Sequence, residues 1–220
     1  MLRPEQRDKL DSSNDLNFYD SPRLVTHVDN GFIDRLTNLY QSELEPNSRV
    51  LDLMSSWVSH LPETMEFAHV EGHGMNEEEL AKNPRLNHYF VQNLNQNPKL
   101  PLEDANFDAV LITVSVQYLQ YPEAVLSEIY RVLKPNGVVI ISFSNRMFYQ
   151  KAIAAWRDGT DTERVNLVRQ YFQSVDGFSE PQIIVHQPPL PGFLQMLGLA
   201  GGDPFYALVA RKLSPDKSEK

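Results

Sequence analysis

Two mostly apolar segments joined by an amphipathic stretch place the strongest constraint on the fold of this chain. Residues 107–115 and 138–143 are rich in valine, isoleucine, leucine and phenylalanine. Such runs are typical of strands that are buried on both faces of a parallel sheet. Between them, residues 122–133 repeat apolar side chains at the spacing of a helix. This strand, helix, strand unit predicts an α/β protein with a mostly parallel sheet.

The same alternation extends over most of the remaining chain. We predict further strands over residues 50–53, 67–71, 89–92, 183–186 and 205–212. We predict further helices over residues 22–44, 77–82, 147–156 and 162–172, the first being one helix or two joined at Gly31. Ser21 with Pro22 predicts the start of the first of these helices, and Asn76 with Glu79 predicts a capping box at the second.

The domain organisation follows from polarity along the chain. Residues 1–20 form an N-terminal arm, expected to be loose over its polar part, residues 21–213 form one domain, and residues 214–220 form a disordered tail. Residues 188–202 are unusually apolar for a connection. They form either a short helix packed on its own domain or a surface for a partner, including a homodimer. The side chains that would make this surface are Phe193, Leu194, Met196 and Leu197.

Composition excludes several classes of function. The chain has 220 residues, a formal net charge of −9 and no cysteine. The missing cysteines exclude a disulfide scaffold and a thiolate nucleophile or metal ligand. The acidic balance argues against a nucleic-acid-binding surface, and we find neither an apolar run of bilayer length nor a signal sequence. We therefore expect a soluble, cytoplasmic protein that binds neither nucleic acid nor membrane.

Residues 49–62 contain the turn around which a ligand site would be built. A short apolar strand leads through Ser55 and Ser56 into what we predict to be a helix, which Pro62 ends early. The N-terminus of a helix that follows a strand offers unpaired N–H groups and a positive dipole end. In open α/β sheets such turns bind cofactors.

Residues 100–142 resemble the class I S-adenosylmethionine-dependent methyltransferases. The stretch Leu-Pro-Leu-Glu-Asp-Ala-Asn-Phe-Asp, residues 100–108, is similar to the family's sequence before the fourth strand, and Arg-Val-Leu-Lys-Pro, residues 131–135, to its turn before the fifth. The resemblance implies a Rossmann-like three-layer α/β/α sandwich with seven strands. It further implies that residues 50–53 lie between the second and fourth strands and that the last strand is antiparallel.

The resemblance also implies where S-adenosylmethionine would bind, and there the sequence departs from the family. Met54, Ser56 and Val58 stand at the three positions of the family's glycine-rich turn. Each adds a Cβ, and a position that needs a positive φ angle is penalised. Ser55 and Ser56 could hold the cofactor carboxylate, or one of them could simply cap a short helix.

Two further strand ends complete the implied cofactor site. Gly74 stands where the family has the acid that binds the ribose, a role that Asn76 could partly take. Asn93 stands where the family often has an aspartate near the adenine, and Asp52 matches the acid of the first strand. The predicted cofactor-binding residues are Asp52, Met54, Ser55, Ser56, Asn76, Asn93, Leu94 and Thr113.

The methyl acceptor would lie beyond the fourth and fifth strands, under the N-terminal helix. Tyr118 and His27 are the candidate catalytic residues, because they are the groups there that could move a proton. The residues predicted to orient the acceptor are Tyr19, Arg23, Gln117, Asn145 and Arg146. A small uncharged or cationic acceptor suits the acidic chain, although two arginines could hold a carboxylate. We predict no metal site, because the stretch from His69 to His73 lacks a third ligand.

These observations favour an S-adenosylmethionine-dependent methyltransferase that acts on a small molecule. The alternative is a methyltransferase-fold protein that has lost the cofactor and serves as a binding or assembly module. A third interpretation keeps the pocket for another nucleoside-like ligand. The missing glycines favour the second interpretation, and the retained Asp52 and Asn93 favour the first.

Overall fold

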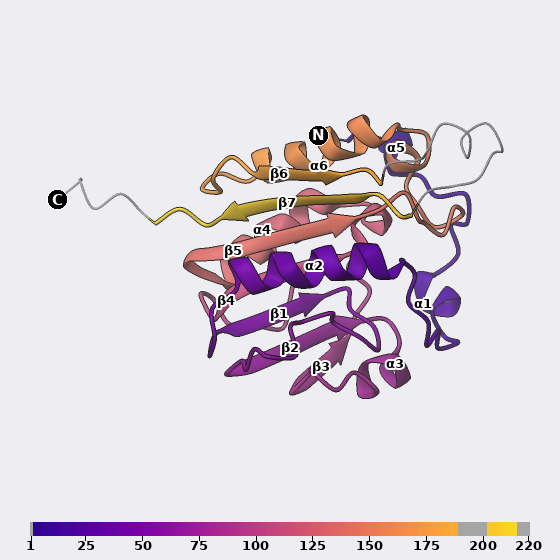
Figure 1. Ribbon diagram of the computed structural model, residues 1–220. Coiled ribbons are helices and arrows are strands. Elements are labelled where there is room, and N and C mark those ends of the chain that lie inside the picture. The colour runs from indigo at the N-terminus through magenta and orange to yellow at the C-terminus, as the bar shows by residue number, and fades with distance from the viewer. Residues whose placement is uncertain (1, 189–201, 215–220) are drawn as a thin grey trace.

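The computed structural model describes residues 2–188 and 202–214, and it contains one seven-stranded sheet (Figure 1). The strands are β1 (Arg49–Leu53), β2 (His69–Gly74), β3 (His88–Val91), β4 (Phe107–Thr113), β5 (Leu133–Phe143), β6 (Gln182–His186) and β7 (Phe205–Arg211). Their order is β3-β2-β1-β4-β5-β7-β6, so β1 lies between β2 and β4. The first five strands are parallel to one another, and β7 is antiparallel to both β5 and β6. The predicted fold class and the predicted position of the first strand are therefore confirmed.

Helices cover both faces of the sheet. They are α1 (Asp15–Phe18), α2 (Asn30–Glu43), α3 (Glu77–Ala81), α4 (Pro122–Val132), α5 (Ala154–Arg157) and α6 (Asp161–Gln173), with 3-10 turns η1 (Pro4–Arg7) and η2 (Val116–Tyr118). Figure 1 shows α2 in front of the sheet and α4 behind it. Alternate residues of β1 serve the two layers: Val50 joins the core under α2, whereas Leu51 and Leu53 join the core under α4 and α6. No helix among the described residues combines the length and apolar character needed to cross a membrane.

The predicted helix over residues 22–44 is wrong in its first part, because α2 begins only at Asn30. The carboxylate of Asp29 accepts a hydrogen bond from Phe32 N (2.8 Å) and so caps the helix. Its second oxygen accepts from the backbone N–H of Asp203 (2.7 Å), 174 positions away. Upstream, Arg23 N donates to Glu79 (2.6 Å), which holds residues 19–29 in a non-helical path. The Ser21 and Pro22 signal therefore does not start a helix.

The helix predicted after β1 is absent. The chain between Leu53 and β2 is irregular, and the hydroxyls of Ser55 and Ser56 donate to the carboxylates of Asp52 (2.5 Å) and Glu79 (2.6 Å). The predicted helix over residues 147–156 is likewise reduced to the short α5. The predicted apolar helix or partner surface at residues 188–202 lies almost wholly outside the described residues.

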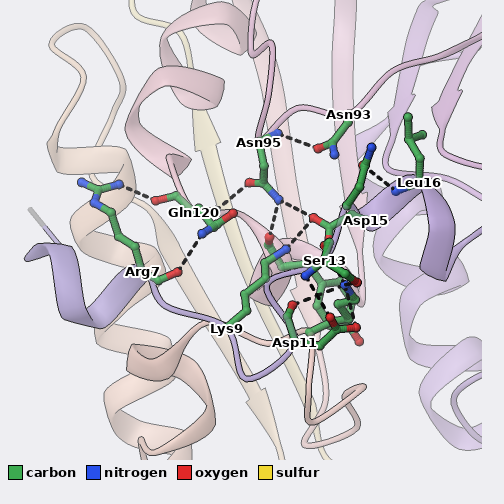
Figure 2. A network of polar contacts seen from close by, with 12 residues as sticks. Arg7, Lys9, Asp11, Ser13, Asp15, Leu16, Asn93, Asn95 and Gln120 are labelled. Carbon is green, nitrogen blue, oxygen red and sulfur yellow. Dashed lines mark hydrogen bonds and ion pairs between the residues drawn. The ribbon is translucent and has the colours of Figure 1, made fainter.

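The N-terminal arm is packed against the domain instead of lying loose. The ammonium group of Lys151 is fully buried and pairs with Asp11 (2.9 Å) and Asp15 (3.3 Å), and Lys9 pairs with Asp15 (2.7 Å). Figure 2 shows Lys9, Asp11 and Asp15 of this network and its continuation from Asp15 to Asn95. A buried charge is stable only when it is paired and hydrogen-bonded. The arm therefore supplies the partners that allow Lys151 to be buried.

This arrangement predicts that Lys151→Met destabilises the protein, although methionine has a similar length. The substitution removes the cation from Asp11 and Asp15 and should lower the free energy of unfolding by about 2 kcal/mol. The matched control is Lys82→Met, because Lys82 pairs with Glu78 while both side chains are about half exposed (47% and 56%). Urea unfolding and limited proteolysis of the arm check the prediction. Equal losses in the two variants would contradict it.

Candidate active site

A cavity of about 350 Å³ lies at the carboxyl ends of β1, β2 and β4. The strand order reverses at β1, because β2 and β3 lie on one side of it and β4 and β5 on the other. Open α/β sheets bind ligands at the carboxyl ends of the strands where the order reverses in this way. All predicted cofactor-binding residues line the cavity: Asp52, Met54, Ser55, Ser56, Asn76, Asn93, Leu94 and Thr113. From the predicted acceptor side, Tyr19, Arg23, His27, Tyr118 and Arg146 line it as well.

Gln117 and Asn145 do not line the cavity. The Gln117 side chain is buried, and its Nε2 donates to the carbonyl of Val114 (2.9 Å) behind the cavity wall. Asn145 is exposed, and its side-chain oxygen accepts a hydrogen bond from the hydroxyl of Ser144 (3.3 Å). Their predicted place in the acceptor site is therefore wrong.

Strained backbone is concentrated around the cavity. Three non-glycine residues that line it have φ angles in the left-handed region: Met54 (60°), His60 (53°) and Val114 (50°). Such a conformation costs roughly 1–2 kcal/mol for a residue with a Cβ. Met54 stands at the first glycine position of the family's turn. Its backbone has a positive φ angle of the kind that glycine adopts easily, so the methionine is held in a strained conformation. Residues held in this way are over-represented at functional sites.

The loop after β1 is fixed by polar contacts that the sequence did not reveal. Met54 N donates to Nδ1 of His73 (3.1 Å), and Ser55 N donates to the His73 carbonyl (2.6 Å). The other ring nitrogen of His73, Nε2, is then the protonated one and donates to the carbonyl of Gln92 (2.9 Å). His73 thus joins the ends of β1, β2 and β3. The sequence around His73 resembles a metal motif only weakly, and it contains no local signal for this structural role.

Residue 74 is a glycine instead of the family's ribose-binding acid, and the structure gives a steric reason. A Cβ added there would lie 2.7 Å from the carbonyl oxygen of Ser55, well inside van der Waals contact. Asn76 does not replace the acid, because it caps α3 through its side-chain oxygen (2.9 Å to Glu79 N) and donates to the Tyr19 carbonyl (2.8 Å). The ribose-binding group of the family therefore has no equivalent at either position.

Asn93 and Leu94 retain groups suited to a purine ring. The side-chain oxygen of Asn93 accepts from Asn95 N (3.0 Å) and has a second lone pair. Among the described residues, neither Asn93 Nδ2 nor Leu94 N donates to a partner. Asn95 in turn donates to Asp15 of the N-terminal arm (3.0 Å) and to the Tyr118 carbonyl (3.0 Å), as Figure 2 shows in part. The arm thus fixes the loop that carries Asn93.

Two carboxylates line the cavity near the loop after β1: Asp52 at the end of β1 and Glu79 in α3. Asp52 is buried, which raises its pKa to about 6 despite the hydrogen bonds from Ser55 and Ser59. Glu79 is buried too and accepts from the Ser56 hydroxyl and from Arg23 N (both 2.6 Å). The sequence predicts Glu79 only as the second half of a capping box with Asn76, and an acid in the first turn of a helix is usually a solvated helix-start charge. Only the folded chain brings three segments to its carboxylate.

The acceptor side is mostly aromatic. The ring of Tyr118 stacks on that of Phe148 (5.9 Å between centroids), and its hydroxyl oxygen accepts from Phe148 N (2.9 Å). Burial raises the pKa of Tyr118. The ring of His27 lies 5.3 Å from that of Phe148, and partial desolvation of the ring lowers the pKa of His27 although the residue is exposed. Arg146 is paired with Asp203 (2.7 Å).

Comparison with known proteins agrees with the class that the fold and the cavity define, the class I methyltransferase fold. A family model described as a methyltransferase domain matches residues 59–141. A demethylmenaquinone methyltransferase from Streptomyces avermitilis is 50% identical over 48 residues, a match that spans only 21% of each protein.

Solved structures share the fold at low sequence identity. A methyltransferase from Archaeoglobus fulgidus aligns with a TM-score of 0.55 at 17% identity, covering 82% of this chain and 92% of the other. The (4+2)-cyclase SpnF aligns with a TM-score of 0.57 at 17% identity, covering 83% and 82%. Residues 59–141 thus match the methyltransferase domain family, and the described residues have the fold of the class I methyltransferases.

The described residues fit the cofactor of this family at its nucleoside end and suit its charge. Asn93 and Leu94 offer unused polar groups for an adenine, and Asp52 and Glu79 suit a ligand with a cationic centre. The glycine turn and the ribose-binding acid are absent, and both loop serines are engaged by carboxylates. The residues that line the cavity therefore fit a nucleoside, but without the family's usual ribose contact.

The titrations of Asp52 and His73 change the free energy of unfolding in opposite directions over the same pH range. The pKa of Asp52 rises from 3.8 to about 6, and that of His73 falls from 6.5 to about 4, both because of burial. Between these values the folded protein keeps a proton on Asp52 that the unfolded chain has lost, so this contribution to stability falls as the pH rises. Over the same range the unfolded chain carries a proton on His73 that the folded protein lacks, so that contribution grows as the pH rises.

We expect the two contributions, each about 3 kcal/mol, to offset one another in the wild type. Relative to wild type, the free energy of unfolding of Asp52→Asn should rise from about pH 4 to about pH 6.5, and that of His73→Gln should fall over this range. Urea unfolding at a series of pH values checks this. A pH profile of Asp52→Asn that runs parallel to that of the wild type would contradict the account.

Proposed function

We propose that this protein is an S-adenosylmethionine-dependent methyltransferase that acts on a small molecule. One observation carries the proposal: a single cavity at the strand ends joins free groups suited to a nucleoside with the imidazole of His27. The methyltransferase domain match, residues 59–141, supports the assignment. The matched relative's name indicates a quinone-type acceptor as one candidate within this class.

Bound S-adenosylmethionine would supply an electrophilic methyl group on a sulfonium centre. Asn93 and Leu94 would hold its adenine, and the carboxylates of Asp52 and Glu79 would stabilise its positive charge. The strained loop after β1 would form the wall beside it. These residues bind and orient, which is the main demand of direct methyl transfer.

His27 is better suited than Tyr118 to accept a proton from the methyl acceptor. Its lowered pKa keeps the ring neutral near neutral pH, as a general base must be. Tyr118 has a raised pKa, so its hydroxyl stays protonated, and Phe148 N already donates to its oxygen. Tyr118 therefore serves as a wall of the site, and His27 as its base.

A second function, ligand binding without catalysis, is favoured by the engaged serines and the missing ribose acid. The two functions separate by calorimetric titration with S-adenosylhomocysteine. We expect saturable binding that Asn93→Ala weakens by about tenfold, because one hydrogen bond to the base is lost. Asn97→Ala is the matched control, since Asn97 lies in the same turn, is exposed and does not line the cavity. Absence of binding by the wild type would overturn the enzyme proposal.

The catalytic assignment predicts a difference between two variants in a methyl-transfer assay against metabolite extracts. His27→Ala should lower kcat by about 100-fold, because the general base is lost. Tyr118→Phe should change kcat by less than about tenfold, because it removes no proton acceptor. The wild-type rate should fall at acidic pH as His27 becomes protonated, below the ordinary histidine range. Equal rates for His27→Ala and wild type would show that the base is misassigned.

A further inference from the structure

The guanidinium of Arg23 is held among aromatic rings beside the cavity. Its central carbon lies 4.5 Å from the ring centroid of Phe18, 5.2 Å from that of Phe148 and 5.7 Å from that of Tyr19. Nη2 donates to the carbonyl of Phe18 (2.9 Å). Nη1 is buried and has no hydrogen-bond partner. Arg23 is therefore a desolvated cation whose hydrogen-bonding capacity is only partly used.

No carboxylate oxygen of the described residues lies within ion-pair distance of this guanidinium. Arg7, Arg131 and Arg146, by contrast, pair with Glu123, Glu128 and Asp203. Glu79 is near in the fold, but it accepts from the backbone N–H of Arg23 and not from the side chain. A buried N–H without a partner costs about 1–3 kcal/mol. Arg23 lines the cavity, and an anionic oxygen of a ligand that reached its guanidinium would satisfy this N–H and neutralise the charge.

The surroundings of Arg23 suit a flat, apolar ligand. Tyr118 and Phe148 stack with an angle of 26° between their ring planes and form one wall. Leu24 and Val25, next to Arg23 in the chain, are 42% and 57% exposed. Trp57 donates its indole N–H to the Val25 carbonyl (3.2 Å) and lines the cavity beside it. The cation thus sits at the edge of an aromatic wall with an apolar rim.

We infer that the acceptor is a flat aromatic molecule with an anionic oxygen, a carboxylate or a phenolate, and that Arg23 binds this oxygen. The inference rests on the proposed function for its site. Of the two possibilities left open by the sequence, it selects an acceptor held by an arginine over an uncharged or cationic acceptor. Arginine pairs with such oxygens by charge-assisted, often bidentate hydrogen bonds. A cationic acceptor would meet the unneutralised guanidinium and be rejected.

The test compares three probes that share one ring system: 2-naphthoate, 2-naphthol and a naphthylmethyl-trimethylammonium ion. Calorimetry on the wild type should show that one of the two anionic probes binds at least about tenfold more tightly than the cation. This probe is either 2-naphthoate or 2-naphthol, and in the second case the pKa of 2-naphthol should be lowered in the bound state. Preference for 2-naphthoate indicates a carboxylate acceptor, and the lowered pKa of bound 2-naphthol, read from its absorbance, indicates a phenolate. Equal binding of all three probes, or no binding, overturns the inference.

Two substitutions of Arg23 separate recognition from a purely structural role. Arg23→Gln should abolish the preference for the anion, and Arg23→Lys should retain part of it, because the charge remains without the planar fork. The matched control is Arg85→Gln, since Arg85 also donates to a backbone carbonyl (Met65, 2.6 Å) and lies over a phenylalanine, Phe67, but outside the cavity. An Arg23→Gln protein that melts like wild type and keeps the anion preference contradicts the inference.

Titration of the same variants with S-adenosylhomocysteine distinguishes failure of this inference from failure of the proposed function. We expect Arg23→Gln to bind S-adenosylhomocysteine within about threefold of the wild type, because the predicted nucleoside contacts are on Asn93 and Leu94. If the wild type prefers the anionic probe but does not bind S-adenosylhomocysteine, the anion site stands and the methyltransferase proposal fails. If the wild type binds S-adenosylhomocysteine and shows no anion preference, the methyltransferase proposal stands and the anion site fails.

Discussion

The site depends on how the loop after β1 is held against the end of β2. Ser55 is the centre of this contact: its N–H donates to the His73 carbonyl, its hydroxyl donates to Asp52, and its carbonyl occupies the space where a Cβ of residue 74 would lie. This contact is compatible with glycine at residue 74 and leaves no room for the Cβ of a ribose-binding acid. Met54, the neighbour of Ser55, has a left-handed conformation at the cavity wall. Two departures from the family's pattern, at residues 54 and 74, thus meet at one packing contact.

Glu79 extends this arrangement to the N-terminal part of the chain. Its carboxylate accepts from the Ser56 hydroxyl and from Arg23 N, so α3, the loop after β1 and residues 19–29 meet at one buried charge. Asn76 adds a second tie, because it caps α3 and donates to the Tyr19 carbonyl. A buried carboxylate with two donors is a strong positional constraint. It holds Arg23 beside the cavity without neutralising its side chain.

The sequence was a good guide to the sheet and a poor one to the segments around the cavity, for a physical reason. Strand positions follow from apolar runs such as residues 107–113, and the start of α3 follows from the side chain of Asn76 three residues before its partner. Both signals are local. The non-helical path of residues 22–29 depends on Glu79, and the cap at Asp29 is fixed by Asp203, 174 positions away. No local pattern contains such partners, so the sequence signals at Ser21 and at Ser55 with Ser56 predict helix starts that do not form.

The same distinction between local and global properties applies to charge. The chain carries a formal net charge of −9, yet interactions between charges in a desolvated site depend on the groups within a few ångströms, not on the total. The cavity is lined by two carboxylates, those of Asp52 and Glu79, each stabilised by a serine hydroxyl, and by the guanidinium of Arg23, which lies among aromatic rings. Glu79 also accepts from the backbone N–H of Arg23, so groups of both signs line one cavity. A site lined by both signs suits a cationic methyl donor together with an anionic acceptor, which is the pair that the proposed methyl transfer requires.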